Sequence, residues 1–118
     1  LNKLNISLNK LTKFNCLLVK KCISQYYKSK IYFKKPNDLI IKKKKICGIL
    51  QEKINKFNND YLIVGIGINL IKSPSIKNYP TTNLKKLINK DISKKKIEIE
   101  LKKIFENSLN KLLKKGYN

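Results

Sequence analysis

Three short segments decide the fold: KKPNDL at residues 34–39, KICGIL at residues 45–50 and GIGIN at residues 65–69. The last two lie within long apolar stretches, which predict consecutive strands over 46–54 and 61–70. Glycines interrupt both strands, and a glycine inside a strand often marks the close approach of a ligand or of another backbone. The segments therefore predict either a slot for a slender ligand or a close packing contact with a helix.

The glycines of the two strands are spaced to clear one side of the sheet. Gly65 and Gly67 are two residues apart, so both leave the same face without a side chain. Gly48 interrupts the preceding strand in the same way. GIGIN is not the dinucleotide-binding fingerprint, because the third glycine and the helix that should follow are missing. The strand over 61–70 is mostly apolar, so we expect both of its faces to be buried.

Turn-forming residues divide the region before these strands. Extended chain is predicted over 31–33 and 39–41, because both stretches are β-branched or aromatic. Proline fixes φ and lacks an amide hydrogen, so Pro36 breaks the strand and stiffens the turn. Turns and loops are predicted at residues 36–38, 42–44, 58–60 and 73–81.

Helices are predicted at both ends of the chain. Residues 8–27 place apolar side chains at three- and four-residue steps: Leu8, Leu11, Phe14, Leu18, Cys22 and Tyr26. A short helix over 84–89 has Thr82 or Asn83 as its N-cap. The last helix starts at Ser93 and stops at Gly116, and its apolar face consists of Ile97, Leu101, Ile104, Phe105, Leu109, Leu112 and Leu113. We therefore expect residues 1–118 to form one α/β (α+β) domain, or part of one, with a mixed, largely antiparallel sheet flanked by helices.

The strong positive charge of the chain suggests nucleic-acid binding, but its amino-acid composition argues against this interpretation. The formal net charge is +21, and all 28 basic residues are lysine. Lysine, asparagine and isoleucine share A/T-rich codons, so genome composition explains the pattern more simply than a ligand does. A surface dedicated to nucleic acid would be expected to use arginine. We therefore expect no specific nucleic-acid binding, and no transmembrane segment because no long apolar run exists.

The cysteines and the missing histidines exclude several kinds of site. The three cysteines, Cys16, Cys22 and Cys47, are odd in number and have no metal-ligand spacing. A disulfide framework and a zinc site are therefore not expected, and a reducing cytoplasm is the natural compartment. The chain has no histidine, which excludes Ser-His-Asp and Cys-His catalysis within it.

The polar residues of the motifs suit a carboxylate held against a phosphate. The turn at Pro36 presents Asn37 and Asp38 at a defined angle, where they suit a nucleobase edge, an amine or a magnesium ion. Lys45, seven residues after Asp38, stands where it can stabilise charge on a carboxylate or an α-phosphate. Each residue also has an ordinary interpretation: Pro-Asn-Asp is a common turn, Lys45 ends a solvated lysine run, and Asn69 can cap the next turn.

The combined order and spacing resembles the core of the biotin protein ligase family. The resemblance rests on Lys-x-Pro-Asn-Asp-Leu, then Lys-Ile-x-Gly-Ile-Leu-x-Glu, then Ile-Val-Gly-Ile-Gly-Ile-Asn-Leu. Residues 79–84, Tyr-Pro-Thr-Thr-Asn-Leu, are similar to the segment that follows in that family. The similarity extends over about residues 8–115.

The resemblance implies an ATP-dependent ligase. Enzymes of this family activate biotin as biotinyl-adenylate, with Mg²⁺ accompanying ATP, and transfer biotin to a lysine of a carboxyl carrier protein. It implies catalytic roles for Lys45, Asp38 and Lys34 at the reacting centre. It further implies that two asparagines line the nucleotide end and that four residues form the biotin slot: Asn37 and Asn69, then Gly48, Leu50, Gly65 and Gly67.

Two departures from the family pattern limit this expectation. Lys35 stands where the family usually has tryptophan. The glycine/arginine-rich loop that lies upstream in the family has no counterpart, and the chain does not begin with methionine. We therefore expect a partial catalytic domain, from a longer reading frame, that is inactive or nearly so by itself. A lipoate ligase, a non-catalytic relative and a basic nucleic-acid-binding module remain as alternatives, and a homodimer is left open.

Overall fold

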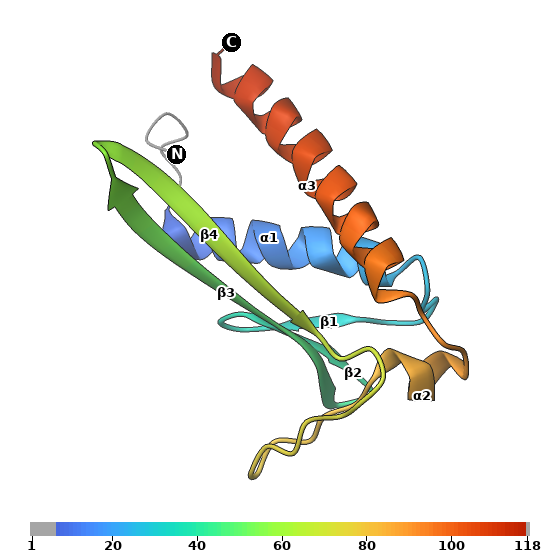
Figure 1. The fold of residues 1–118 in the computed structure, drawn as a ribbon. Coiled ribbons are helices and arrows are strands. Elements are labelled where there is room, and N and C mark those ends of the chain that lie inside the picture. Colours follow the sequence, from blue (N-terminus) through green and yellow to red (C-terminus); the bar gives the residue numbers. More distant parts are fainter. Residues whose placement is uncertain (1–6, 118) are drawn as a thin grey trace.

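In the described part of the chain, four strands and three helices follow one another in the order that the sequence predicts (Figure 1). The computed structural model describes the backbone of residues 7–117 and the side chains of residues 7–111. The elements are α1 (Leu8–Ile23), β1 (Tyr32–Lys34), β2 (Asp38–Ile41), β3 (Lys44–Lys56), β4 (Asn59–Ile68), α2 (Leu84–Ile88) and α3 (Lys94–Tyr117).

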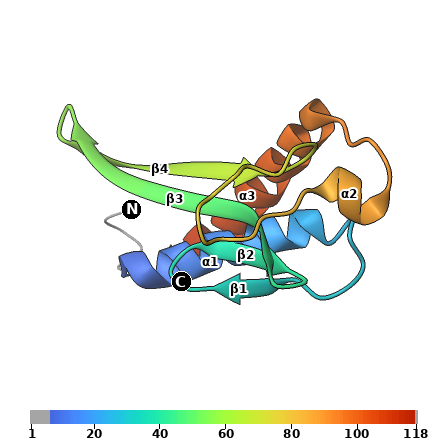
Figure 2. The ribbon, with the colours of Figure 1, turned by 90° about the horizontal axis from the view of Figure 1, so that it is seen from below.

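The strands form one antiparallel sheet in the order β1-β2-β3-β4. The turns before β3 and before β4 each use two residues with positive φ. Lys42 and Lys43 have φ of 50° and 65°, and Phe57 and Asn58 have φ of 52° and 62°. Left-handed backbone at both central residues matches the twist of a tight hairpin. Each strand therefore folds back beside its predecessor, and the last two make a long curved ribbon (Figure 2).

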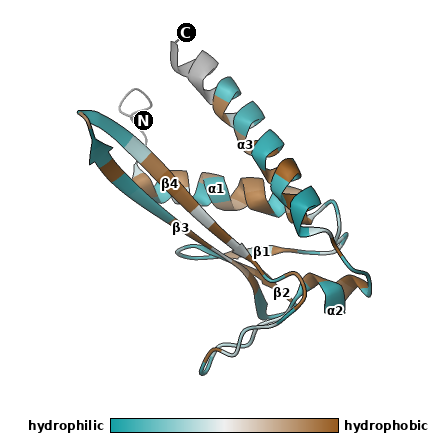
Figure 3. Cartoon of the chain, in the orientation of Figure 1, coloured by the Kyte–Doolittle hydropathy of each residue, from teal (hydrophilic) through white to brown (hydrophobic). Residues whose placement is uncertain are grey.

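Helices α1 and α3 form a layer on one face of this sheet. Helix α1 contacts β1, β2 and β3, and α3 packs across α1. Between them lie the fully buried core side chains, among them Val19, Ile23, Leu39, Ile41 and Ile49. In Figure 3 the apolar stretches of α1 and of the strands meet in this layer. We call the sheet surface away from α1 the open face.

A buried amide fixes α1 to the middle of β3. Asn15 is 2% exposed, and its Nδ2 donates a hydrogen bond to Oε1 of Gln51. The side-chain nitrogen of Gln51, Nε2, in turn donates to the backbone carbonyl of Leu8 at 3.2 Å and to the hydroxyl of Thr12. Because a buried amide without partners is costly, these bonds select one register of α1 on the strand.

The three cysteines are buried in the core as free thiols. Burial is the largest cause that raises their pKa, to about 11 for Cys16 and Cys22 and to about 12 for Cys47. They therefore pack as small apolar residues, as the sequence predicts. Within the described residues, no helix is long and apolar enough to cross a membrane.

Several predictions of local structure are wrong. Strand β4 is not buried on both faces: its residues alternate between exposed and half-buried, because no described element covers the open face. Helix α1 ends at Ile23, and Leu8 is 53% exposed instead of lying on the buried side.

The C-terminal helix also differs from its prediction. Helix α3 continues through Gly116 to Tyr117, so the glycine does not stop it. Ile97 is buried, and Leu101, Ile104 and Phe105 pack against the core as predicted, whereas Leu109 is 37% exposed. The predictions for Leu112 and Leu113 lie outside the described side chains.

Candidate functional site

Four of the predicted site residues, one from each strand, pair directly with one another and form a row across the sheet. Lys34 of β1 lies directly opposite Asp38 of β2, Asp38 opposite Gly48 of β3, and Gly48 opposite Gly67 of β4. Residues directly opposite one another in an antiparallel sheet point to the same face. The row therefore presents a cation, a carboxylate and two bare glycines on the open face. Asp38 begins β2 and is not a turn residue, contrary to the prediction.

A bulge in β3 brings Lys45 to the same face. Leu39 pairs with Cys47 and the next residue, Ile40, pairs with Lys45, so Ile46 has no partner in β2. In an unbroken strand Lys45 would share the buried face with Cys47, because side chains alternate. The additional residue of the bulge reverses this, since it shifts the alternation by one. Lys45 consequently extends over Gly48, within 3.2 Å of the position that a Cβ there would take.

Lys45, Asp38 and Tyr79 form a compact polar cluster. Nζ of Lys45 lies 3.4 Å from Oδ1 of Asp38, with side-chain exposures of 24% and 12%. The hydroxyl of Tyr79 donates a hydrogen bond of 2.6 Å to the other carboxylate oxygen, Oδ2. Nζ of Lys34 lies 4.5 Å from the centre of the Tyr79 ring. The Asp38 carboxylate is thus bound by Lys45 at one oxygen and by Tyr79 at the other, while the Lys45 side chain is still partly exposed to solvent.

Sequence reasoning did not assign a role to Tyr79. It lies 41 residues after Asp38 in the chain, so no short-range spacing links the two. Backbone bonds bring its segment to the site: the amide of Lys45 donates to the carbonyl of Pro80 at 2.8 Å, and the amide of Thr82 donates to the carbonyl of Lys45 at 2.9 Å. The only signal in the sequence is the resemblance of residues 79–84 to the family.

Gly48, Gly65 and Gly67 leave a strip of the open face beside this cluster without side chains, and Leu50 lies on the same face. Leu50 pairs with Gly65, two residues along the strands from the pair of Gly48 and Gly67. Leu50 is 70% exposed, although leucine usually lies inside proteins. A Cβ at Gly65 or Gly67 would meet only backbone oxygens, at 3.6 and 3.8 Å. No helix packs on these glycines, so the structure excludes a helix contact within the described residues as the reason for them.

The two predicted asparagines lie in different environments. Asn37 is half-buried in the turn before β2, and its carbonyl accepts a hydrogen bond of 2.9 Å from the amide of Ile49. The side chain of Asn69 binds backbone: its Nδ2 donates to the carbonyl of Thr82 at 3.1 Å and to that of Lys45 at 3.4 Å. Asn69 therefore anchors the end of β4 to the segment that carries Tyr79.

The chain is similar to known proteins over most of its length. Residues 5–69, over half of the chain, match the model of the biotin/lipoate A/B protein ligase family. The chain belongs to that family. The biotin protein ligase of Aquifex aeolicus in its apo form is 28% identical, with a TM-score of 0.72. The same enzyme in complex with biotin and ATP is 30% identical, with a TM-score of 0.71.

This ligase-family chain spans less than half of the length of the solved structures that it matches. The match covers 88% of the chain and 46% of the apo Aquifex enzyme, and 89% and 45% for the complex with biotin and ATP. A P. falciparum protein solved in complex with lipoate shares the fold at 21% identity, with a TM-score of 0.61, over 87% of this chain and 31% of that protein. No curated protein sequence matches the chain.

Removing the hydroxyl of Tyr79 should loosen the polar cluster of this ligase-family chain. We expect Tyr79→Phe to lower the free energy of unfolding by about 1 kcal/mol, because Asp38 loses a hydrogen bond in a half-buried site. Urea unfolding of the two proteins measures the difference. Tyr61→Phe is the matched control, since Tyr61 is 47% exposed on the open face. Equal stabilities of the two variants would contradict a structural bond at Tyr79.

The stability of this ligase-family chain should fall at alkaline pH. Burial first, then the hydrogen bond and charge of Asp38, raise the pKa of Tyr79 to about 12, and burial raises the pKa of the three thiols. A raised pKa means that the folded state holds its proton more tightly, so this stabilisation is complete below pH 9 and is lost as pH rises toward 12. We expect the urea midpoint to fall steadily above pH 9. Tyr79→Phe should show a shallower fall, and identical profiles would contradict the contribution of this tyrosine.

Proposed function

We propose that the chain is the part of a biotin protein ligase that holds the reacting groups. The enzyme would activate biotin with ATP as biotinyl-adenylate and transfer it to a lysine of a biotin carboxyl carrier protein. The observation that supports this most is the placement of Lys45 over Gly48 beside Asp38, next to a bare strip of sheet. A carboxylate lying over Gly48 and Gly67 would reach the lysine ammonium beside the Leu50 side chain.

In the first step, a carboxylate oxygen of biotin attacks the α-phosphorus of ATP and pyrophosphate leaves. Negative charge is concentrated on the carboxylate and phosphate oxygens as they approach. The ammonium of Lys45 would stabilise this charge in a preorganised position, because its ion pair with Asp38 and its place over Gly48 already orient it. Lys34, held over the Tyr79 ring, would bring a second positive charge to the same row.

In the second step, the amine of the acceptor lysine attacks the carbonyl carbon of the adenylate and AMP leaves. The attacking amine must be neutral and correctly oriented. Asp38 would orient it by accepting a hydrogen bond, and its carboxylate is the acidic group of the row. Asn37 and Asn69 would border the nucleotide, and Gly48, Leu50, Gly65 and Gly67 would border the biotin rings and tail.

Mg²⁺ would arrive with ATP. Within the described residues, no group of three His, Cys, Asp or Glu side chains is arranged to hold a metal. Asp38 is also already bound to Lys45 and Tyr79. The phosphate oxygens of ATP are therefore the expected ligands of the ion.

Competition between the two acids of the family tests the proposal. The full product of the reading frame that contains this chain is titrated with biotin in the presence of ATP, and lipoate is then added as competitor. We expect saturable biotin binding that lipoate displaces only at far higher concentration. Displacement at equal concentration would favour a lipoate ligase. No binding of either acid would favour a non-catalytic relative that retains the fold.

A further inference from the structure

Two open hollows beside β1 are lined by lysines. One, of about 550 Å³, is bordered by Lys30, Lys34, Lys42 and Lys43 together with Tyr27, Ser29, Tyr32 and Ile40. The other, of about 570 Å³, shares Ser29, Lys30 and Tyr32 with the first and adds Lys20, Lys28 and Ile31. The hollows are therefore neighbours, and together they extend from β1 and β2 to the end of α1.

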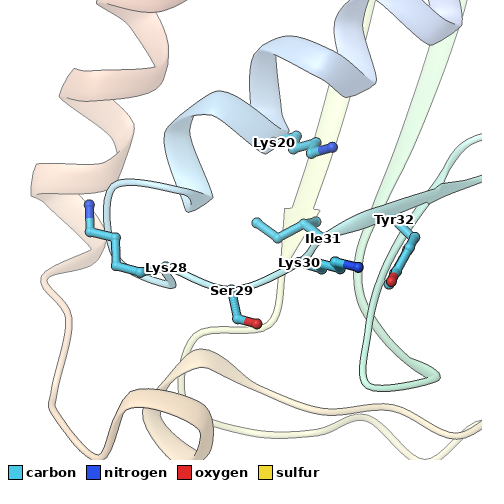
Figure 4. A pocket seen from close by; sticks show the side chains of 6 residues that line it. All are labelled: Lys20, Lys28, Ser29, Lys30, Ile31 and Tyr32. Atoms are coloured by element: carbon cyan, nitrogen blue, oxygen red, sulfur yellow. The ribbon is translucent and has the colours of Figure 1, made fainter.

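The amines in the second hollow do not all point the same way. Figure 4 shows Lys20 of α1 and Lys30 of the following loop extending their amines toward the same side, with the hydroxyl of Tyr32 beside Lys30. Lys28 directs its amine to the opposite side. We define the lysine cluster by the side chains that line the hollows without Lys28: Lys20, Lys30, Lys34, Lys42 and Lys43.

The lysine cluster has no counter-charge of its own. Neither hollow is lined by an acidic residue, although the described part of the chain contains all seven aspartates and glutamates. Across residues 7–111, no ion pair joins a lysine of the cluster to a carboxylate. Like charges that face one another without compensation are unfavourable, so the binding of an anionic partner would relieve the repulsion.

The lysine cluster is continuous with the proposed reaction centre. Tyr32 of β1 lies opposite Ile40 of β2, and Ile40 lies opposite Lys45 of β3. This second row of the open face therefore leads directly from the wall of the first hollow to Lys45. Lys34 belongs both to that hollow and to the row that contains Asp38. A chain whose lysine reaches Asp38 would have its flanking residues over the hollow.

We propose that the lysine cluster docks the acidic surface of the acceptor protein beside its target lysine. This inference rests on the proposed function, because it assigns the partner surface of the same site. Tyr27, Tyr32 and Ile40, which line the first hollow, can pack against the carbon atoms of a polypeptide. The ammonium groups of the lysine cluster can pair with its aspartates and glutamates. A nucleic acid fits less well, since the cluster surrounds hollows and contains no arginine to read phosphates in pairs.

Charge reversal in the lysine cluster tests the inference. The double variant Lys30→Glu/Lys43→Glu leaves the proposed catalytic lysines in place. Its matched control is Lys95→Glu/Lys96→Glu, two exposed lysines of α3 that change the net charge equally. Each full gene product is assayed for binding of the biotin carboxyl carrier domain of the same organism, for the KM of that domain, and for biotin-dependent ATP–pyrophosphate exchange. Thermal unfolding verifies that the variants are folded.

We expect the cluster variant to weaken carrier binding and to raise the KM for the carrier by about tenfold, with a smaller dependence on salt. Pyrophosphate exchange, which needs no acceptor, should stay unchanged, and the control should resemble the parent protein. Equal carrier binding by the parent and both variants would overturn the inference. So would an equal loss in both variants, because it would indicate net charge alone.

Two further outcomes separate this inference from the proposed function. Absence of pyrophosphate exchange in the parent protein would contradict the ligase activity, while the direct binding measurement would still decide whether the lysine cluster docks the carrier. Duplex DNA serves as the competing polyanion. If the cluster variant loses DNA binding and keeps its carrier affinity, the surface serves nucleic acid and the inference is wrong.

Discussion

Lys45→Ala is expected to lower biotin-dependent pyrophosphate exchange by the full gene product on the order of 10²- to 10³-fold, the usual loss when a preorganised charge-stabilising donor is removed. The physical reason is local. Lys45 is turned onto the open face by the bulge and held over Gly48 beside Asp38. Alanine at this position leaves the backbone bonds to Pro80 and Thr82 in place, so the sheet should persist.

Lys44→Ala is the matched control for this prediction. Lys44 precedes Lys45 in the same lysine run and is exposed at the start of β3. If the run only solvates the turn, the two variants should behave alike. Comparable exchange rates for Lys44→Ala and Lys45→Ala would therefore contradict the role of Lys45, whereas a loss confined to Lys45→Ala would support it.

Gly48→Ala is expected to reduce exchange by roughly tenfold, with a change in unfolding free energy below about 1 kcal/mol. A Cβ at Gly48 would lie 3.2 Å from both Cε and Nζ of Lys45, and 3.6 Å from Oδ1 of Asp38. The contact is with the far end of a flexible side chain, so the lysine can move aside while the strand remains. Its ammonium then leaves the position from which it would stabilise the reacting oxygens.

Gly65→Ala is the control that distinguishes displacement of Lys45 from the mere addition of a methyl group to the glycine strip. A Cβ at Gly65 meets only the carbonyl oxygen of Leu50 at 3.6 Å, and it does not contact Lys45. We expect Gly65→Ala to raise the KM for biotin with little change in kcat, and Gly48→Ala chiefly to lower kcat. The same KM and kcat pattern in both variants would argue against displacement of the lysine as the cause.

The strands and their order could be predicted because each strand is an apolar run that ends in polar turn residues. The turn through Lys42 and Lys43 was predicted, but its left-handed backbone was not. Left-handed backbone is usual for glycine or asparagine, and lysine gives no such signal. The predicted site residues Lys34, Asp38, Gly48 and Gly67 share one row because strand pairing follows from hairpin order.

The remaining errors arise where tertiary contacts decide the outcome. The apolar residues of β4 predict burial on both faces, but whether a strand face is covered depends on which other elements pack there. Tyr79 reaches Asp38 through backbone bonds between β3 and a distant loop, which no local pattern encodes. The bulge at Ile46 is also invisible in the sequence, since KICGIL is compatible with a regular strand.

The bulge has a consequence for how this segment tolerates evolutionary change. Regular pairing of all four residues 45–48 would turn Lys45 toward α1, because three steps along a strand reverse the face. Deletion of one residue between Lys45 and Gly48 would instead remove the bulge and leave the lysine on the open face. Insertion of one residue elsewhere in the strand would displace the glycines from the face that they keep clear. A single deletion at the bulge should therefore be tolerated better than an insertion or a deletion elsewhere in β3. The constraint on β3 is therefore on the number of its residues as much as on their identity.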